Sequence, residues 1–296
     1  MERCILCPRE CNVDRSDEKK GYCGESHTIR VARTSLHQWE EPCITGECGS
    51  GTIFFSGCGL KCIFCQNYNI ADSSVGMEFT IEELADAMLR LQENKASNIN
   101  LVTAGHFIDE LVLVIHLAKE KGLTIPVVYN SSAYEKVETI KKLEGLVDVY
   151  LPDCKFYDSQ IAAQYANAPD YFAVASSAIC EMVRQTGEPQ FDEKTGNMVK
   201  GVIVRHLILP GHTNDSKKII EYLYHTYGNQ IYLSIMNQYT PIREFTSYPN
   251  LNRRVTKREY EKVVGYALLL GVERAFIQEG TTADKSFIPT FDCSFL

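Results

Sequence analysis

The sequence predicts an α/β fold around a parallel sheet, either a partial or complete β/α barrel or a doubly wound sheet. From residue 52 to about residue 280, short apolar runs alternate with longer amphipathic segments. Strands that alternate with helices in this way form parallel sheets. The chain has 296 residues, of which 45% are hydrophobic, so it can form one large domain with an attachment or two modest domains.

Seven apolar runs are expected to be the strands. They lie at residues 52–57, 98–104, 124–130, 147–153, 202–209, 230–238 and 274–280. Helices are expected at residues 80–95, 107–122, 133–146, 214–228 and 256–271, with further helical stretches from 154 to about 187. Thr80 and Glu83 have the spacing of a capping box, which marks the start of the first of these helices. The pattern corresponds to six or seven β/α units.

The first 48 residues show little periodicity and contain many turn residues. A segment of this kind builds little core of its own, so metal ligation would help it to hold its shape. We therefore expect two parts, a Cys-rich metal-binding segment at residues 1–48 and a β/α core with a C-terminal tail at residues 49–296.

Cysteines are concentrated near the N-terminus. The chain has 12, and nine of them lie in the first 65 residues, at positions 4, 7, 11, 23, 43, 48, 58, 62 and 65. The charged N-terminus is neither a secretion signal nor a transit peptide, and the sequence has no apolar run of about 20 residues. We therefore expect a cytoplasmic protein without a membrane span, in which clustered thiols bind metal rather than form disulfides.

Charge and motifs exclude several other function classes. The formal net charge is −8 and the pI is about 5.5, so we expect no nucleic-acid partner. The sequence also has no Walker phosphate-binding loop, no dinucleotide-binding glycine fingerprint and no nucleophile elbow.

The stretch "SGCGLKCIFCQN" begins where the first expected strand of the core ends. Its cysteines, Cys58, Cys62 and Cys65, have the spacing C-x3-C-x2-C. In parallel α/β folds, sites form at the carboxyl ends of the strands. Three thiolates hold three irons of a [4Fe–4S] cluster and leave the fourth iron open to another ligand. The alternatives are a zinc site or thiols without a function.

These residues carry a family resemblance. A C-x3-C-x2-C loop with an aromatic residue, Phe64, before its last cysteine resembles the signature of radical S-adenosylmethionine (SAM) enzymes. "CPRECNVDR", "VARTSLHQWEEPCITG", "GSGTIFFSGCGLKCIFCQNYNIA", "VDVYLPDCK" and "VRHLILPG" extend the resemblance over nearly the whole chain. They are similar to a bacterial and archaeal family that is related to pyruvate formate-lyase activating enzyme and whose substrates are largely unassigned.

The resemblance implies a [4Fe–4S] cluster on Cys58, Cys62 and Cys65, with SAM as the second cofactor. It implies one-electron cleavage of SAM to methionine and a 5′-deoxyadenosyl radical, which takes a hydrogen atom from the substrate. A flavodoxin- or ferredoxin-type protein is the expected electron donor. Three hypotheses remain open: an activase for a glycyl-radical protein, a radical SAM enzyme for a peptide or small metabolite, and a non-catalytic electron-transfer protein.

The resemblance also suggests residues that contact SAM. The family usually has a Gly-Gly-Glu-like motif after the second strand, but this chain has "VTAGHF", without a glutamate. Thr103, backbone carbonyls or His106 are the candidates to replace it, and His106 has a structural role as its alternative. Asn130, Ser131 and Ser132 follow the third strand as further candidates, although turn residues are often polar for other reasons.

Charged residues follow or occupy the next two strands. Asp153 and Lys155 resemble the Asp-x-Lys of the activases and are the candidate catalytic and SAM-binding pair, with a local ion pair as the alternative. They lie two residues apart and so point to one face of a strand. Arg205 lies in an otherwise buried strand and is expected to bind SAM or an acidic neighbour, because an unpaired buried charge is costly. His206 is expected to pack on the opposite face.

Weaker candidates end the last two strands. Asn237 is the expected adenine- or substrate-binding residue of the sixth strand, with Met236 and Gln238 beside it. Gln278 and Glu279 end the seventh strand.

The cysteines at the N-terminus form a second candidate site. Cys4, Cys7, Cys11 and Cys23 suit zinc or an iron–sulfur cluster, and the sequence leans slightly toward zinc or another structural metal. Cys43 or Cys48 is the alternative for one of the four ligands. Trp39 lies between the two metal regions in the sequence and is expected to pack them together.

Overall fold

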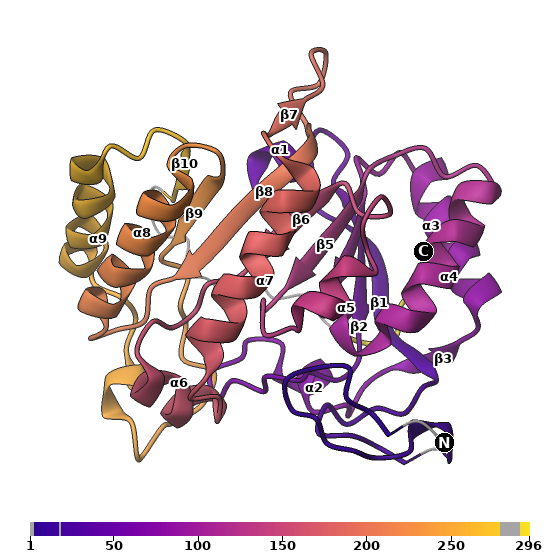
Figure 1. Cartoon of the computed structure of the whole chain (residues 1–296), viewed down its shortest axis with the longest axis horizontal. Coiled ribbons are helices and arrows are strands. Elements are labelled where there is room, and N and C mark those ends of the chain that lie inside the picture. The colour runs from indigo at the N-terminus through magenta and orange to yellow at the C-terminus, as the bar shows by residue number, and fades with distance from the viewer. Residues whose placement is uncertain (1–2, 18, 279–290) are drawn as a thin grey trace.

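A computed structural model describes residues 3–17, 19–278 and 291–296 (Figure 1). The strands are β1 Ile29–His37, β2 Ser50–Phe55, β3 Met77–Phe79, β4 Ile99–Val102, β5 Val127–Ser131, β6 Val149–Pro152, β7 Gln190–Phe191, β8 Met198–Leu207, β9 Tyr232–Met236 and β10 Ala275–Ile277. The α-helices are α1 Pro42–Thr45, α2 Tyr68–Ala71, α3 Ile81–Glu93, α4 Ile108–Glu120, α5 Val137–Lys141, α6 Ser159–Ala166, α7 Tyr171–Thr186, α8 Thr213–Tyr227 and α9 Lys257–Leu270. Short 3₁₀ turns lie at Arg15–Asp17, Gly105–Phe107 and Pro249–Asn252.

The sheet follows the chain in order. Its strands are arranged β10-β9-β8-β6-β5-β4-β2-β1-β3, and every neighbouring pair from β2 to β10 on this path is parallel. A sequential order without a reversal distinguishes a barrel-type sheet from a doubly wound one. Right-handed crossovers then place the helices on one face, and Figure 1 shows them around the outside of the curved sheet. The fold is a partial β/α barrel, as the sequence predicts.

All seven expected strands of the core are present, as β2, β4, β5, β6, β8, β9 and β10. The capping box of α3 is also confirmed, because the Thr80 hydroxyl accepts from the Glu83 backbone and the Glu83 carboxylate accepts from the Thr80 backbone. The apolar face of this helix, with Leu84, Met88 and Leu91, is buried in the main core. Caps of this kind contribute about 1 kcal/mol to helix stability.

Strand β1 was not expected from the sequence, because it lies inside the poorly periodic first 48 residues. It pairs antiparallel with β2, and its register shifts between Val31 and Arg33. The irregularity and the polar residues of the strand conceal the alternation on which strand prediction depends. β1 therefore adds an antiparallel edge to the sheet, on which β3 then pairs.

The two ends of the barrel are covered by different parts of the N-terminal region. Because β1 is antiparallel, it ends beside the start of β2, and α1 follows at the amino end of the parallel strands. The residues before β1 lie at the opposite, carboxyl end, where Figure 1 places the N-terminus below α2.

Among the helices of the described residues, none combines the length and apolar character that crossing a bilayer requires.

Two expectations for the N-terminal region are wrong. Cys43 is buried among Val128 and Val149, which begin parallel strands, and Cys48 precedes β2. Both cysteines are therefore at the opposite end of the barrel from the other N-terminal cysteines and replace none of them. Trp39 is 63% exposed and lines a cavity inside the barrel, which is described below. It therefore does not pack two metal regions together.

Candidate active site

A cavity of about 240 Å³ lies inside the partial barrel and extends to the carboxyl ends of its strands. It collects most of the residues that the sequence analysis selected, although they come from six different strands or loops. These are Cys58, Cys62, Cys65, Thr103, Asn130, Ser131, Ser132, Asp153, Lys155, Arg205, Met236 and Gln238.

The loop with Cys58, Cys62 and Cys65 follows β2 through a tight turn at Gly57. This glycine has φ of 83°, and a Cβ there would overlap the Glu25 side chain at 2.6 Å, so only glycine fits. Phe64 anchors the loop by packing its ring against those of Phe156, Tyr165 and Tyr239. The two fixed ends hold the intervening thiols at the edge of the cavity.

The thiols suit an iron–sulfur cluster chemically. The backbone N–H groups of Leu60 and Lys61 approach the Cys58 sulfur at 3.4 and 3.5 Å, and such donors stabilise a metal-bound thiolate. Burial raises the pKa of Cys62, and it raises the pKa of Cys65 to about 12, so these groups stay protonated without a metal. A bound metal cation deprotonates coordinating thiols. The donor set therefore fits the three-cysteine cluster that the sequence predicts.

Thr103 follows β4 at the edge of the same cavity. It has φ of 60°, in the left-handed region that β-branched residues rarely adopt. Its backbone N–H donates to the Asn130 carbonyl at 2.9 Å, which holds this conformation. Strain of this kind costs of order 1–3 kcal/mol and is concentrated at functional sites. It turns the backbone beside the cysteine loop, where the missing Gly-Gly-Glu motif was expected.

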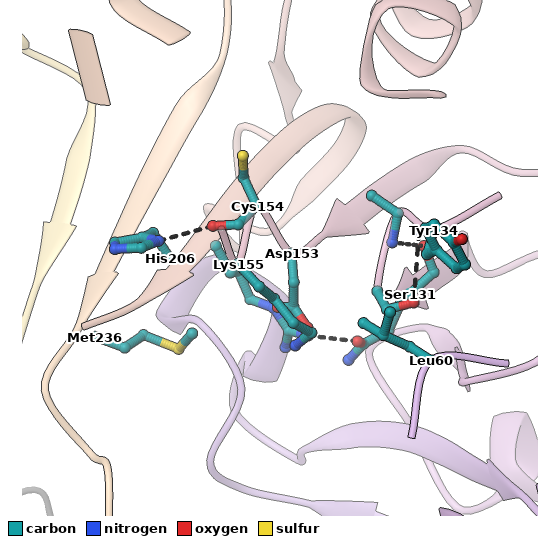
Figure 2. A network of polar contacts seen from close by, with 12 residues as sticks. Leu60, Ser131, Tyr134, Asp153, Cys154, Lys155, His206 and Met236 are labelled. Carbon is teal, nitrogen blue, oxygen red and sulfur yellow. Dashed lines mark hydrogen bonds and ion pairs between the residues drawn. The ribbon is translucent and has the colours of Figure 1, made fainter. Parts of the chain in front are cut away.

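A network of charges forms the inner wall of the cavity. The Lys155 ammonium lies 2.5 Å from Asp153 Oδ2, and the Arg205 Nε donates to Asp153 Oδ1 at 3.0 Å. Arg205 also donates to the Asn130 side chain at 2.5 Å and lies 3.3 Å from the Glu40 carboxylate. Figure 2 shows Asp153 and Lys155 side by side near Ser131. Arg205 therefore has the acidic neighbours that the sequence predicts, and Lys155 makes the local ion pair that was the alternative to SAM binding.

The pKa values in this network show how strongly its charges depend on one another. Burial alone would raise the pKa of Asp153, but Arg205 and Lys155 outweigh it and hold the pKa below its usual value. Burial also acts on Glu40, where it raises the pKa despite the opposing effect of Arg205. Both carboxyl groups thus depend on one guanidinium group, and burial acts on both in the same direction, but the net pKa shift is downward for Asp153 and upward for Glu40.

Glu40 is the main site residue that sequence analysis missed. It enters the barrel from the loop after β1, at the end opposite to the cysteine loop. The side-chain amides of Asn100 and Asn130 donate to its carboxylate at 3.1 and 3.3 Å. Two adjacent glutamates, Glu40 and Glu41, were the one sequence signal, and exposed loops contain such pairs as well.

Other residues that the sequence analysis considered lie outside this cavity. His206 is buried, and its Nδ1 interacts with the Cys154 carbonyl at 2.7 Å, away from Asp153 and Lys155 (Figure 2), as expected for a packed histidine. Asn237 is not among the described residues that line the large cavity, and its backbone N–H donates to the Gln278 side chain. Glu279 lies outside the described residues.

His106 lies outside the large cavity and has structural contacts. Its Nε2 donates to the Ser56 carbonyl at 2.6 Å, and its own carbonyl accepts from Arg15 at 2.6 Å. Burial lowers its pKa to about 3, so the ring is neutral at physiological pH. These contacts support the structural alternative for His106, which ties the loop after β4 to the loop after β2.

Glu135 packs against the loop after β4, which contains Thr103 and Gly105. Its carboxylate accepts from the Tyr129 hydroxyl at 2.5 Å and from the Ser131 hydroxyl at 3.1 Å. A Cβ at Gly105 would overlap this carboxylate, so the glycine of "VTAGHF" is required by Glu135. Burial raises the pKa of Glu135 to about 7, although both hydroxyls lower it.

The Glu135→Gln variant is expected to be more stable than the native chain at pH 8 and close to it at pH 4.5. A carboxyl whose pKa rises from 4.5 to about 7 on folding destabilises the folded chain as pH rises through that interval, by about 3 kcal/mol. The amide cannot ionise, and its oxygen still accepts from Tyr129. Urea unfolding of both proteins at the two pH values measures the difference. A difference in stability that does not change with pH would contradict this account.

The comparisons with known proteins agree with this geometry. The family model of the radical SAM superfamily matches residues 52–223, which include the cysteine loop and β2 to most of α8. The chain belongs to the radical SAM superfamily. Membership implies a [4Fe–4S] cluster and SAM as cofactors, and members of the superfamily are generally enzymes. The predicted family is thereby confirmed.

Two proteins are similar to this chain in sequence. An uncharacterized protein of Methanocaldococcus jannaschii, MJ0674, is 30% identical over 277 residues, which cover 90% of this chain and 75% of that protein. The pyruvate formate-lyase-activating enzyme of Clostridium pasteurianum is 27% identical over 172 residues, which cover 56% of this chain and 65% of the enzyme. The chain is thus similar to an activating enzyme over about half of its length.

Solved structures share the fold. HydG, a maturase of the [FeFe]-hydrogenase, has a TM-score of 0.50 at 18% identity and is matched over 74% of this chain and 48% of its own. Streptococcus suis SuiB bound to S-adenosylmethionine has a TM-score of 0.50 at 14% identity and is matched over 75% and 48%. The chain spans about half the length of these two proteins, and the likeness concerns the fold alone.

Proposed function

We propose that this protein is a radical SAM enzyme that cleaves SAM reductively at a [4Fe–4S] cluster held by Cys58, Cys62 and Cys65. The observation that carries the proposal is the cavity itself, in which the three thiols face strand-end polar groups and a network of charges. Cys58, Cys62 and Cys65 would hold the cluster, which would supply the electron for reductive cleavage of SAM and so the radical chemistry for hydrogen abstraction from the substrate.

The residues nearest the cysteine loop are proposed to bind the polar end of SAM. Thr103, Asn130 and Ser131 end neighbouring strands and present hydroxyl and amide groups to the cavity. Lys155 interacts electrostatically with Cys62 and Cys65, whose pKa values it lowers against the larger effect of burial. Its ammonium group lies 2.5 Å from Asp153 Oδ2 and lines the same cavity as the cysteine loop, where it can pair with a carboxylate of SAM.

Arg205 and Glu40 are proposed to shape the deeper part of the cavity. Arg205 fixes the orientation of Asp153, Glu40 and Asn130, because each accepts from one of its three nitrogen atoms. Asp153 is thereby kept ionised, which keeps Lys155 protonated. Asp153 and Lys155 remain the candidate catalytic pair. Asp153 is the group that orients Lys155 or contacts the substrate backbone.

The substrate is proposed to be a glycyl-radical protein, with the chain acting as its activase. This proposal is supported by the similarity to the activating enzyme of Clostridium pasteurianum and by Asp153 and Lys155 at the end of β6. A peptide or small-metabolite substrate is the alternative, supported by the divergent "VTAGHF" loop and by the N-terminal cysteines. In either case a flavodoxin- or ferredoxin-type donor would supply the electron.

The test is anaerobic. The full chain, reconstituted with iron and sulfide, is mixed with dithionite and SAM, and 5′-deoxyadenosine is measured. We expect it to form, and we expect SAM to change the electron paramagnetic resonance (EPR) spectrum of the reduced cluster before cleavage. A reduced, intact cluster that neither responds to SAM nor cleaves it would contradict the proposal and favour the electron-transfer protein.

The activase function needs a second readout. A candidate glycyl-radical protein encoded beside this chain is added to the reduced enzyme with SAM. The expected result is the EPR doublet of a glycyl radical, with one 5′-deoxyadenosine formed for each radical. Cleavage of SAM without a protein radical would instead favour the peptide or small-metabolite alternative.

A further inference from the structure

The four N-terminal cysteines have no role in the proposed reaction, yet the structure gathers them. Backbone hydrogen bonds between Cys4 and Val13, and between Asn12 and Cys4, bring Cys4 beside Cys11. A Cβ at Gly21 would lie 3.0 Å from the Cys11 sulfur and 3.6 Å from the Cys23 sulfur. The chain therefore folds three of its four thiols around one short loop.

The fourth thiol, Cys7, points to the cysteine loop of the proposed cluster. Its sulfur lies 3.9 Å from the position of a Cβ on Gly59, the residue after Cys58. Cys7 and Cys58 also line the same small cavity, of about 30 Å³. From the other side, the Cys58 backbone N–H donates to the Cys23 carbonyl at 3.1 Å. Both cysteine sets thus meet at Cys58 and Gly59.

Arg9 holds the N-terminal segment in this position. Its guanidinium donates to the carbonyls of Gly59 and Ala166 at 2.9 and 2.8 Å, and it lies over the Tyr22 ring at 4.2 Å. A single side chain therefore connects the segment, the cluster loop and the end of α6. Fixed contacts of this kind position the segment without regular secondary structure.

The spacing of the four cysteines indicates which metal chemistry they suit. Structural zinc sites commonly take their ligands as two close pairs, such as C-x2–4-C with a second pair further along. Three close cysteines followed by one distant cysteine are typical of iron–sulfur proteins. Cys4, Cys7, Cys11 and Cys23 follow the second pattern, which favours iron–sulfur over the structural zinc that the sequence analysis slightly preferred.

We propose that Cys4, Cys7, Cys11 and Cys23 bind a second iron–sulfur cluster, docked directly against the loop that carries Cys58. Four protein ligands leave no open iron, so this cluster does not bind SAM. Its closeness to the first cluster rests on the proposed function of Cys58, Cys62 and Cys65, but its existence does not.

Metal content tests the proposal. Three proteins are reconstituted anaerobically: the native chain, the Cys7→Ser, Cys11→Ser double variant, and the Cys58→Ala, Cys62→Ala, Cys65→Ala triple variant. We expect about eight irons in the native chain and about four in each variant. Cys180→Ser, on the exposed surface of α7, is the matched control and is expected to keep about eight irons.

The triple variant decides the outcome even if the double variant fails to fold, because it keeps all four N-terminal cysteines. About four irons in it support the second cluster. One zinc and no iron in it, or no metal at all, would overturn the proposal. The iron contents also distinguish this outcome from failure of the proposed function. If Cys58, Cys62 and Cys65 hold no cluster, the double variant would hold no iron while the triple variant still held about four.

The position of the second cluster has its own readout. Two reduced paramagnetic clusters in neighbouring loops are expected to broaden each other's EPR signals. The spectrum of the reduced native chain is therefore expected to differ from the sum of the double-variant and triple-variant spectra. A native spectrum equal to that sum would contradict docking of the second cluster against the Cys58 loop.

Discussion

Replacing Cys58, Cys62 or Cys65 by alanine is expected to reduce SAM cleavage to the background rate while the chain stays folded. Under the proposed function each thiolate would hold one iron, and the two protein ligands that remain would not be enough to keep the cluster. The loop itself is held by Phe64, Gly57 and Arg9 rather than by the metal. Formation of 5′-deoxyadenosine under dithionite, with iron content and circular dichroism on the same samples, measures both parts of this prediction.

Cys180→Ala is the control for the loss of a thiol as such, because Cys180 is exposed on α7 and far along the chain from the loop. It is expected to keep native iron content and native cleavage. Native rates of SAM cleavage in all three loop variants would show that these cysteines do not hold the cluster. Loss of rate together with loss of the circular dichroism signal would show that the loop depends on the metal for folding.

The parallel core was predictable because its central strands β2, β4, β5 and β6 are buried on both faces. A strand such as β5 or β6 is then a continuous apolar run, and the runs alternate with amphipathic helices that end in recognisable caps. β1 lies between β2 and the short edge strand β3, and it has a register shift and polar residues. Its assignment depends on its partner β2, which a pattern within one segment does not contain.

The site was predictable to the extent that strand ends define it. Thr103, Asn130 and Asp153 follow or end strands and were selected through the family resemblance, and Arg205 was selected as a charge in an otherwise apolar strand. The structure brings all four to one cavity. Glu40 was missed since it reaches the cavity from the other end of the barrel, and its contact with Arg205 joins residues 165 positions apart. Nothing local to Glu40 indicates that contact.

The same contact leads to the second large prediction, that Arg205→Met strongly destabilises the chain at neutral pH. Methionine fills much of the space of the arginine but leaves the buried carboxylates of Asp153 and Glu40 without their shared cation. Removing one partner from a buried charge network costs about 3–5 kcal/mol. Urea unfolding at pH 8, with equal iron loading of both proteins, measures this loss.

The pH dependence separates lost charge pairing from lost packing. In the native chain, Arg205 helps to depress the pKa of Asp153, so the stability from this pairing is present above pH 3.8 and is lost as pH falls through the depressed pKa. Without Arg205, Asp153 keeps only Lys155 as a cationic partner and Glu40 keeps none, so both pKa values rise relative to the native chain and the variant becomes less stable than the native chain as pH rises. The difference between the two proteins is therefore expected to be larger at pH 8 than at pH 4.5. Equal destabilisation at both values would show that Arg205 acts through packing alone, and Arg205→Lys, which keeps the charge, would then rescue nothing.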